Sequence, residues 1–330
     1  MANVTFNIIT TMLFGRNISG EIGKVEYIDS NNYTVYELDF ADCYTRVSND
    51  IMGNRFTVKT LFFPILNRFD IMTPYNINYK NIRSLWKATK EFLAKNREED
   101  SIYNRMLQKE GAEEESVFQD LFGFLFAGHE TSSHAIGSTV YFLYKNPEVK
   151  EKLEKELSEF MGKSHEEIGK ILNKEKLEEL DYLHMVVKES LRVDPPAGEA
   201  LPYEIIDDTS VCGVELKKGD VINVNILPRH YDPEEWHDPL KFIPERFDPE
   251  SKYFTTPKSG KARDPLSWMP FSTHLRICPG QSLAMLEIKV ILVYLLSRVN
   301  FEFADHLMES DYAYFSIISQ LTLNFSAELK

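Results

Sequence analysis

The chain has 330 residues, enough for one large domain or two ordinary ones, and its 43% hydrophobic and 27% charged residues predict a folded globular protein. With 37 basic and 51 acidic residues the net charge is −14, which argues against nucleic acid as a partner. Cys43, Cys212 and Cys278 are widely spaced, which argues against a disulfide framework or a zinc site and suits a reducing, intracellular compartment.

The first apolar stretch, residues 6–15, has no positive segment before it and no small-residue cleavage site after it. It is also shorter than the roughly 20 apolar residues that span a bilayer. We therefore expect neither a signal peptide nor a membrane anchor in this sequence. Phe6, Ile9 and Leu13 recur at near-helical spacing, so residues 3–14 are predicted to form a helix.

The next part of the chain alternates between a loop and helices. Residues 61–79 are rich in Phe, Pro, Ile and Asn, and we predict a broken, apolar loop. A helix is predicted over residues 81–107, and a long helix follows at about 116–145. Because the long helix is apolar on most sides, it should cross the middle of the fold. Residues 148–160 carry i,i+4 Glu/Lys pairs, which predict a solvated helix.

The C-terminal half adds a small β portion. A helix over residues 177–193 is ended by Pro195 and Pro196. Short strands are predicted between 201 and 224, including one over 211–216, and a hairpin over 312–325. With a further apolar helix at 282–299, the sequence predicts a mainly α fold with a small β portion, in one domain that includes the whole chain.

Cys278 is the residue with the most informative surroundings. It precedes Pro279 and Gly280 at the start of an apolar helix, and Arg276 lies two residues before it. The partial positive charge of a helix N-terminus favours a thiolate, and Gly280 lets a large flat group approach the backbone. Arg276 can neutralise a carboxylate on that group. Together these features indicate an axial ligand of haem iron; the alternative is a structural cysteine at a helix start.

A second polar group interrupts the long apolar helix at residues 127–132. Burying the polar side chains of Glu130 and Thr131 in such a helix costs free energy unless they form hydrogen bonds or have a function. Thr131 can bond back to a helix carbonyl and Gly128 can ease a local kink, which would open a groove for oxygen and water. The alternative is a polar stripe that faces a loop.

A third pair, Glu189 and Arg192, stands at i,i+3 on a predicted helix and can form an ion pair. Surface pairs of this kind contribute about 0–1 kcal/mol, so the pair alone is a weak signal. It gains weight from the segment 244–247 downstream, Pro-Glu-Arg-Phe, which contains Arg246.

These segments, in this order, resemble the cytochrome P-450 family. Its haem loop, Phe-x-x-Gly-x-Arg-x-Cys-x-Gly, is matched over about 271–280 except for one glycine, and its oxygen-activation motif, Ala/Gly-Gly-x-Asp/Glu-Thr-Thr/Ser, is matched over 127–132. The resemblance covers essentially the whole chain. It implies the C-terminal two-thirds of the cytochrome P-450 fold, with 116–145 as the long central helix.

The resemblance also implies roles for particular residues. Thr131 and Glu130 would be the catalytic pair, the hydroxyl assisting oxygen activation and the carboxylate feeding protons. Glu189, Arg192 and Arg246 would form a structural triad behind the cysteine loop. The haem b site would contain the iron ligand Cys278 together with Arg276, Phe271, Gly280, Ala284 and His230, the last as a contact of a haem propionate.

By resemblance, the chain is a haem-dependent monooxygenase that transfers one atom of molecular oxygen to an apolar small molecule. NADPH would supply electrons through a reductase, and the chain would act as a monomer at the face of the endoplasmic reticulum membrane. A peroxide-rearranging relative is an alternative, but it needs no proton relay, and the Glu130–Thr131 pair argues against it. The other alternative is an inactive member or a mere haem binder.

The sequence departs from the family pattern in three places. His274 replaces the glycine of the haem loop, which would bring strain of about 1–3 kcal/mol if that position has positive φ. Tyr203 stands where the family commonly has a propionate-binding arginine. The N-terminal part of the family domain, with its Trp-x-x-x-Arg helix, is expected to be absent, because residues 1–17 resemble a helix well inside that domain. Trp86 and Lys90 copy the Trp-x-x-x-Arg spacing but fall in the wrong region.

Overall fold

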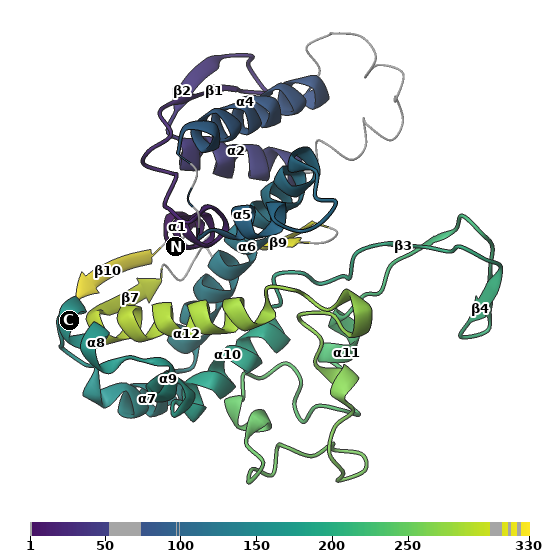
Figure 1. Ribbon diagram of the computed structural model, residues 1–330. Helices are drawn as coiled ribbons and strands as arrows, with labels where there is room; N and C mark the ends of the chain where they lie inside the picture. The colour runs from purple at the N-terminus through teal and green to yellow at the C-terminus, as the bar shows by residue number, and fades with distance from the viewer. Residues whose placement is uncertain are drawn as a thin grey trace. The chain divides into compact units, whose positions relative to one another are not determined.

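The computed structural model describes residues 2–52, 74–96, 98, 100–303, 312–315, 318–321 and 325–330. The chain divides into two compact units, Met1–Ser133 and His134–Lys330. Helix α6 (Glu114–Lys145), the long helix predicted from the sequence, contributes residues to both (Figure 1).

The first unit is helical apart from one hairpin. Phe6 on α1 is fully buried, and its ring lies 5.9 Å from that of Phe40, 5.2 Å from that of Tyr44 and 5.3 Å from that of His129. These aromatic contacts join α1, α2 and the first part of α6 into one small core. Besides that part of α6, the elements are α1 (Ala2–Phe14), β1 (Val25–Ile28), β2 (Val35–Leu38), α2 (Phe40–Met52), α4 (Pro74–Lys95) and α5 (Ile102–Leu107).

The predicted helix at 3–14 is confirmed as α1, but the single helix predicted at 81–107 is wrong. The structure has α4 and α5 instead, because the Ser101 hydroxyl accepts a hydrogen bond from the Asn104 N–H (3.2 Å) and starts a new helix. Helix α4 also begins earlier than predicted, with Pro74 in its first turn, where proline suits a helix. Residues 61–73 of the predicted loop lie outside the described residues.

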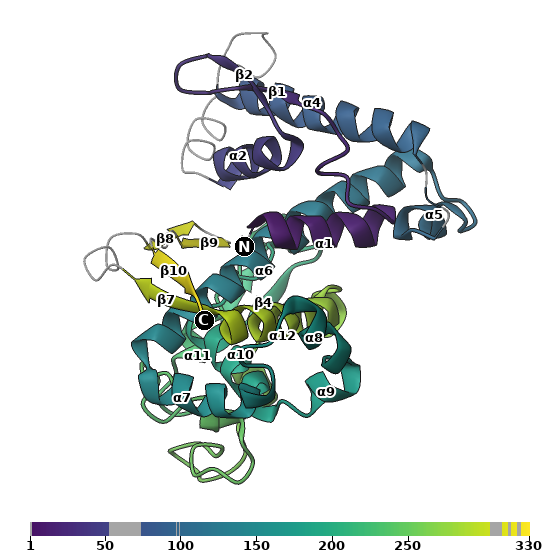
Figure 2. The ribbon, with the colours of Figure 1, turned by 90° about the vertical axis from the view of Figure 1, so that its left-hand side faces the viewer.

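The β1–β2 hairpin and α2 were not predicted from the sequence. The two strands pair antiparallel, with Val25 opposite Leu38 and Ile28 opposite Val35. The side-chain amide of Asn81 on α4 bonds to both the N–H and the carbonyl of Ile28, each at 2.9 Å, which places the hairpin beside α4 (Figure 2).

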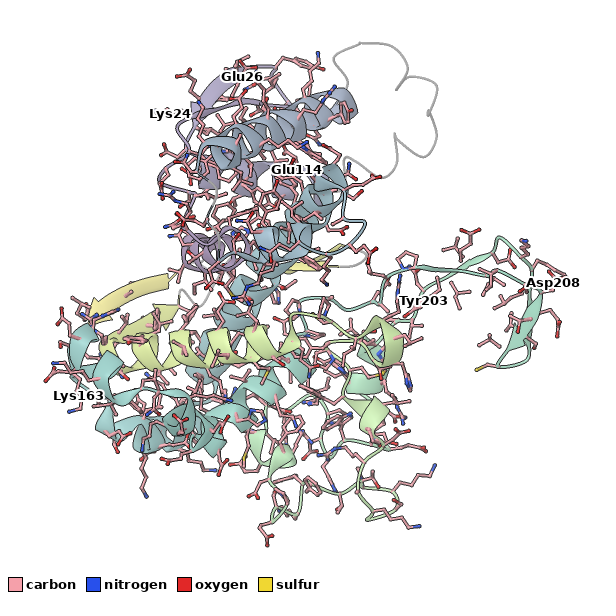
Figure 3. The ribbon with its side chains drawn as sticks, viewed as in Figure 1. Lys24, Glu26, Glu114, Lys163, Tyr203 and Asp208 are labelled. Carbon is pink, nitrogen blue, oxygen red and sulfur yellow. The ribbon has the colours of Figure 1, made fainter. Side chains whose placement is uncertain are left out.

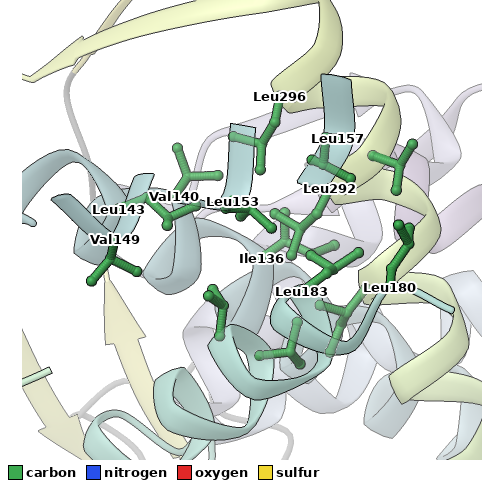
Figure 4. Packing of buried hydrophobic residues seen from close by; sticks show 14 of the residues in the cluster. Ile136, Val140, Leu143, Val149, Leu153, Leu157, Leu180, Leu183, Leu292 and Leu296 are labelled. Carbon is green, nitrogen blue, oxygen red and sulfur yellow. The ribbon is translucent and has the colours of Figure 1, made fainter. Parts of the chain in front are cut away.

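The second unit is built around one apolar core. Most of the buried side chains come from the second part of α6 and from three other helices, α7 (Pro147–Glu156), α10 (Asp181–Val193) and α12 (Gln281–Arg298) (Figure 4). Shorter helices complete this unit: α8 (His165–Ile171), α9 (Lys174–Glu178), α11 (Leu227–His230), and the 3₁₀ turns η2 (Leu157–Glu159), η3 (Pro244–Phe247), η4 (Pro265–Ser267) and η5 (His274–Arg276).

The helix predicted at 177–193 is divided into α9 and α10. Leu180 stands at the N-cap of α10 and cannot cap it with its side chain. The carboxylate of Glu156, at the end of α7, instead accepts the N–H groups of Tyr182 (2.8 Å) and Leu183 (2.9 Å). An anion on these two N–H groups also complements the helix dipole. The predicted helix at 148–160 likewise changes after Glu156, continuing as the 3₁₀ turn η2.

The strands of the second unit form separate antiparallel pairs. The strand predicted over 211–216 is wrong, because the chain turns at Cys212 (φ 50°) and Gly213 (φ 78°), both in the left-handed region that a two-residue hairpin turn requires. The predicted C-terminal hairpin is present as β8 with β9. The pairs are β3 (Tyr203–Glu204) with β6 (Val221–Ile222), β4 (Thr209–Val211) with β5 (Val214–Leu216), β7 (Val299–Phe303) with β10 (Phe325–Leu329), and β8 (Tyr312–Phe315) with β9 (Ile318–Leu321).

The predicted fold class, mainly α with a small β portion, is confirmed. Within the described ranges, none of the helices combines the length and the apolar character that crossing a membrane requires.

The cap that Glu156 provides can be tested by replacing it with alanine. Glu156→Ala should lower the free energy of unfolding by about 1–2 kcal/mol, because two N–H groups at the start of α10 lose an anionic acceptor. Urea denaturation measures the change. Glu151→Ala, at an exposed position of α7, is the control and should change stability by less than about 0.5 kcal/mol. Equal effects of the two substitutions would contradict the cap.

Candidate functional site

The cysteine loop, residues 271–280, ends where α12 begins. The Cys278 N–H donates to the Phe271 carbonyl (2.8 Å) and closes the loop, and the half-buried Cys278 lies two residues before Gly280, the N-cap of α12. Gly280 has no side chain with which to cap this helix end. The thiol is therefore close in sequence to uncapped N–H groups and to the positive end of the helix dipole, which favour an anion.

The backbone of this loop is strained at two positions. His274, at the start of η5, has φ 52°, and Ser272 has φ 60°. For a residue with a Cβ, this left-handed conformation costs about 1–2 kcal/mol. The conformation expected for the missing glycine is therefore present, with an exposed histidine in it.

The residues around Cys278 suit a flat, apolar group that carries carboxylates. Leu275 is fully exposed and Ile277 is 51% exposed, although both are large apolar side chains. A Cβ at Gly280 would meet only the Cys278 Sγ, at 3.8 Å, so the glycine leaves space beside the sulfur. Ala284, half-buried on α12, is also small, and Arg276 is an exposed cation. A thiol, a cation and uncovered apolar surface match the chemistry of haem.

Glu189, Arg192 and Arg246 form a charge cluster behind this loop, and all three side chains are fully buried. The Glu189 carboxylate receives two hydrogen bonds from Arg192 (both 2.8 Å) and one from Arg246 (3.0 Å). It also accepts the Ile243 N–H at 2.8 Å. The structure thus brings together the three residues that the resemblance grouped.

The remaining guanidinium N–H groups of the cluster bind backbone carbonyls. Arg192 donates to the carbonyls of His230 (2.8 Å), Pro239 (2.9 Å) and Lys241 (3.2 Å). Arg246 donates to those of His237, Asp238 (2.8 Å) and Lys241 (3.2 Å). The extra positive charge is therefore surrounded by carbonyl dipoles, and burial lowers the pKa of Arg246 below its usual range.

His230 connects the charge cluster to the cysteine loop. It is fully buried, its Nε2 accepts the Met269 N–H (2.9 Å), and its Nδ1 lies 3.0 Å from the Arg192 carbonyl. The first bond makes Nε2 the acceptor, so Nδ1 carries the proton and donates. Burial lowers the pKa of His230 to about 4. Because both ring nitrogens form hydrogen bonds within the protein, this geometry does not support a propionate contact. His230 instead links the backbone at Arg192 to that at Met269.

Three further contacts, which the sequence did not indicate, hold the segment before the loop. The Trp268 indole N–H donates to the Lys188 carbonyl (3.1 Å), and the Lys188 ammonium lies 4.4 Å from the ring centroid of Phe247 and 4.9 Å from that of Trp268. Burial lowers the pKa of this lysine. The ring of Phe271 lies 6.2 Å from that of Trp268, so the residue opposite Cys278 also packs on this aromatic group.

The polar motif of α6, residues 127–132, belongs to the first unit, whereas the cysteine loop belongs to the second. The Thr131 hydroxyl donates to the Ala127 carbonyl (2.7 Å), the backward bond that the sequence predicted, and α6 stays helical there. A Cβ at Gly128 would lie 2.9 Å from the Ile9 side chain, so this glycine permits the close approach of α1 rather than a kink. Glu130 Oε1 lies 3.4 Å from His129 Nδ1.

A buried histidine–aspartate hydrogen bond in the second unit was also missed. His134, on α6, has Nε2 2.9 Å from Asp194 Oδ2, with side chains 5% and 1% exposed. In the sequence, the only available signal was a histidine soon after the α6 motif and an aspartate just before Pro195 and Pro196.

The comparisons with known proteins place these features in a family. A model of the family described as "Cytochrome P450" matches residues 1–324. Cytochrome P450 4V2 of Rattus norvegicus is 36% identical over 182 residues, which are 55% of this chain and 32% of that protein. Berbamunine synthase of Berberis stolonifera is 31% identical over 263 residues, which are 77% of this chain and 50% of that protein. The chain thus spans about a third to a half of the length of these relatives.

Breaking the charge cluster should be strongly destabilising. Glu189→Gln keeps the shape of the side chain but leaves two buried guanidinium groups without a counter-charge, so the free energy of unfolding should fall by about 3–5 kcal/mol. Urea denaturation measures the loss. Glu178→Gln removes an exposed carboxylate 3.8 Å from Lys174 and should cost less than about 0.5 kcal/mol. A loss below 1 kcal/mol in Glu189→Gln would contradict a cluster held by charge.

The lowered pKa of His230 should make stability depend on pH. The unfolded chain takes up a proton on this histidine near pH 6.5, whereas the folded chain does so only near pH 4. The contribution is therefore fully present above pH 6.5 and is lost as the pH falls to 4, by about 3 kcal/mol in total.

The measurement is urea denaturation at several values of pH between 7.5 and 4, for the wild type and for His230→Gln. The variant should lack the contribution of about 3 kcal/mol, so its stability should fall less than that of the wild type. His165→Gln, at an exposed position, should keep the wild-type profile. Parallel profiles for the wild type and His230→Gln would contradict the neutral, buried state of His230.

Proposed function

The chain belongs to the cytochrome P450 family, and on that basis we propose that it acts as a haem-dependent monooxygenase on an apolar organic substrate. The observation that carries the proposal is the cysteine loop: a half-buried thiol at the uncapped start of α12, held by the Cys278–Phe271 hydrogen bond. The fold of the chain and the order of its motifs support the same function.

Haem b, when bound, would supply the one-electron and oxygen chemistry of the reaction. Cys278 would hold the iron through its sulfur, and the start of α12 would stabilise the thiolate. Gly280 and Ala284 would leave room for the flat ring. Arg276 would bind a carboxylate of the haem, and Phe271 would fix the far side of the loop.

Proton delivery is proposed for the pair on α6. The Glu130 carboxylate, with 23% of its side chain exposed, can exchange a proton with water and pass it toward the Thr131 hydroxyl. Thr131 donates its own proton to Ala127, so this bond must be released before the hydroxyl can donate elsewhere. Glu189, Arg192, Arg246 and His230 have no chemical role in this proposal and support the loop.

We also propose an electron donor, a substrate class and a cellular location for the chain. NADPH would provide electrons through a reductase, and the substrate would be an apolar small molecule. The chain is proposed to work as a monomer and as one domain over its 330 residues, at the face of the endoplasmic reticulum membrane. The family to which the chain belongs supports a reductase partner and an apolar substrate.

The test is the difference spectrum between the reduced and the reduced, carbon-monoxide-bound protein after reconstitution with haem. We expect a long-wavelength Soret band typical of thiolate ligation, and Cys278→Ser should abolish it. Cys212→Ser, which removes an exposed cysteine, is the control and should keep the band. Haem uptake without that band would contradict thiolate ligation by Cys278, and absence of haem uptake would contradict the proposed function.

A further inference from the structure

Tyr203 contacts the cation of the cysteine loop. The Cζ atom of Arg276 lies 5.7 Å from the centroid of the Tyr203 ring, within the range of a cation–π interaction. Both residues belong to the second unit: Tyr203 is the first residue of β3, and Arg276 is the last residue of η5. We propose that Tyr203 is a positioning residue that holds the Arg276 guanidinium for a haem carboxylate, an inference that rests on the proposed function.

The Arg276 side chain is exposed and would otherwise be free to rotate. Among the described residues, no carboxylate forms an ion pair with Arg276. A guanidinium has five N–H donors and can bind a carboxylate in a bidentate manner. The cation–π contact with Tyr203 limits the rotation of Arg276 and so reduces the side-chain entropy that binding would cost.

The backbone of Tyr203 is well placed for this task. Tyr203 lies opposite Ile222 in the β3–β6 pair, and the Ile205 N–H donates to the Asp220 carbonyl at 2.8 Å just beyond it. The side chain is half-buried, and Figure 3 shows Tyr203 near the root of the strand-rich arm that carries β4. The ring is thus presented by a paired strand and not by an open loop.

A tyrosine at this position changes how the site deals with charge. An arginine here, as the resemblance would have it, would place a second cation next to Arg276, and the two would repel each other until an anion bound. The ring attracts the guanidinium with or without the anion. In this chain, the single cation Arg276, held by the Tyr203 ring, takes the place of two neighbouring cations.

The experiment measures the affinity for iron protoporphyrin IX and for its dimethyl ester, which lacks both carboxylates, by absorbance titration. Tyr203→Leu should weaken binding of the free acid by about 2- to 10-fold, because the freed Arg276 side chain must then be ordered on binding, and should leave binding of the ester unchanged. Tyr203→Phe keeps the ring and should bind both compounds as the wild type does. In an Arg276→Gln background, Tyr203→Leu should have no further effect.

Two results would overturn the inference. One is an equal loss for the free acid and the ester, which would assign Tyr203 to the fold alone. The other is a loss in Tyr203→Phe equal to that in Tyr203→Leu, which would assign the effect to the hydroxyl. Repeating the titrations with Cys278→Ser separates this inference from the proposed function, since a carboxylate preference that depends on Tyr203 needs no bond between Cys278 and iron.

The contact between Tyr203 and Arg276 can also be tested without haem. With ¹⁵N-labelled arginine, the ring current of Tyr203 should shift the Arg276 side-chain N–H signal upfield. Tyr203→Leu should abolish the shift, and Tyr203→Phe should retain it. An unshifted signal in the wild type would overturn the inference.

Discussion

One buried carboxylate holds two buried guanidinium groups, and the irregular segment that follows α11 in the second unit depends on that cluster. Taking Glu189, Arg192 and Arg246 out of water costs several kcal/mol for each ion, so the cluster is stable only if its geometry is close to ideal. The cluster meets that condition, because the carboxylate binds both guanidinium groups and their other N–H groups reach backbone carbonyls. The carbonyls belong to His230, the last residue of α11, and to residues 237–241 in the segment between α11 and η3, so the cluster fixes the conformation of this irregular segment.

A chain of hydrogen bonds connects the charge cluster to the cysteine loop. The Arg192 carbonyl meets His230, and His230 accepts the N–H of Met269, two residues before Phe271. Phe271 in turn closes the loop on Cys278. The loop contains two left-handed residues with side chains, and such strain persists only where the surroundings impose it. The rigid support behind the loop explains how a strained backbone can present a thiol at the start of α12.

The sequence predicted the helices with a strong apolar pattern and the order of the motifs, because buried faces and special residues leave local signals. It did not predict the β1–β2 hairpin, because β2 is exposed along most of its length and lacks the alternation of a half-buried strand. It also did not predict the turn at Cys212, since a cysteine rarely adopts positive φ. His230 and Gly128 were given roles toward a ligand or a kink. Their actual partners, Met269 and Ile9, are distant in sequence, and no local pattern encodes such contacts.

The claim that the charge cluster supports the cysteine loop can be tested directly by amide hydrogen exchange, comparing Glu189→Gln with Leu153→Ala. The second variant opens a cavity in the core at α7 and lowers stability by a similar amount, about 2–5 kcal/mol, without touching the cluster. We predict that the Met269 and Cys278 amides lose more protection in Glu189→Gln than in Leu153→Ala, relative to amides of α12. Equal losses at these amides in both variants would contradict the claim.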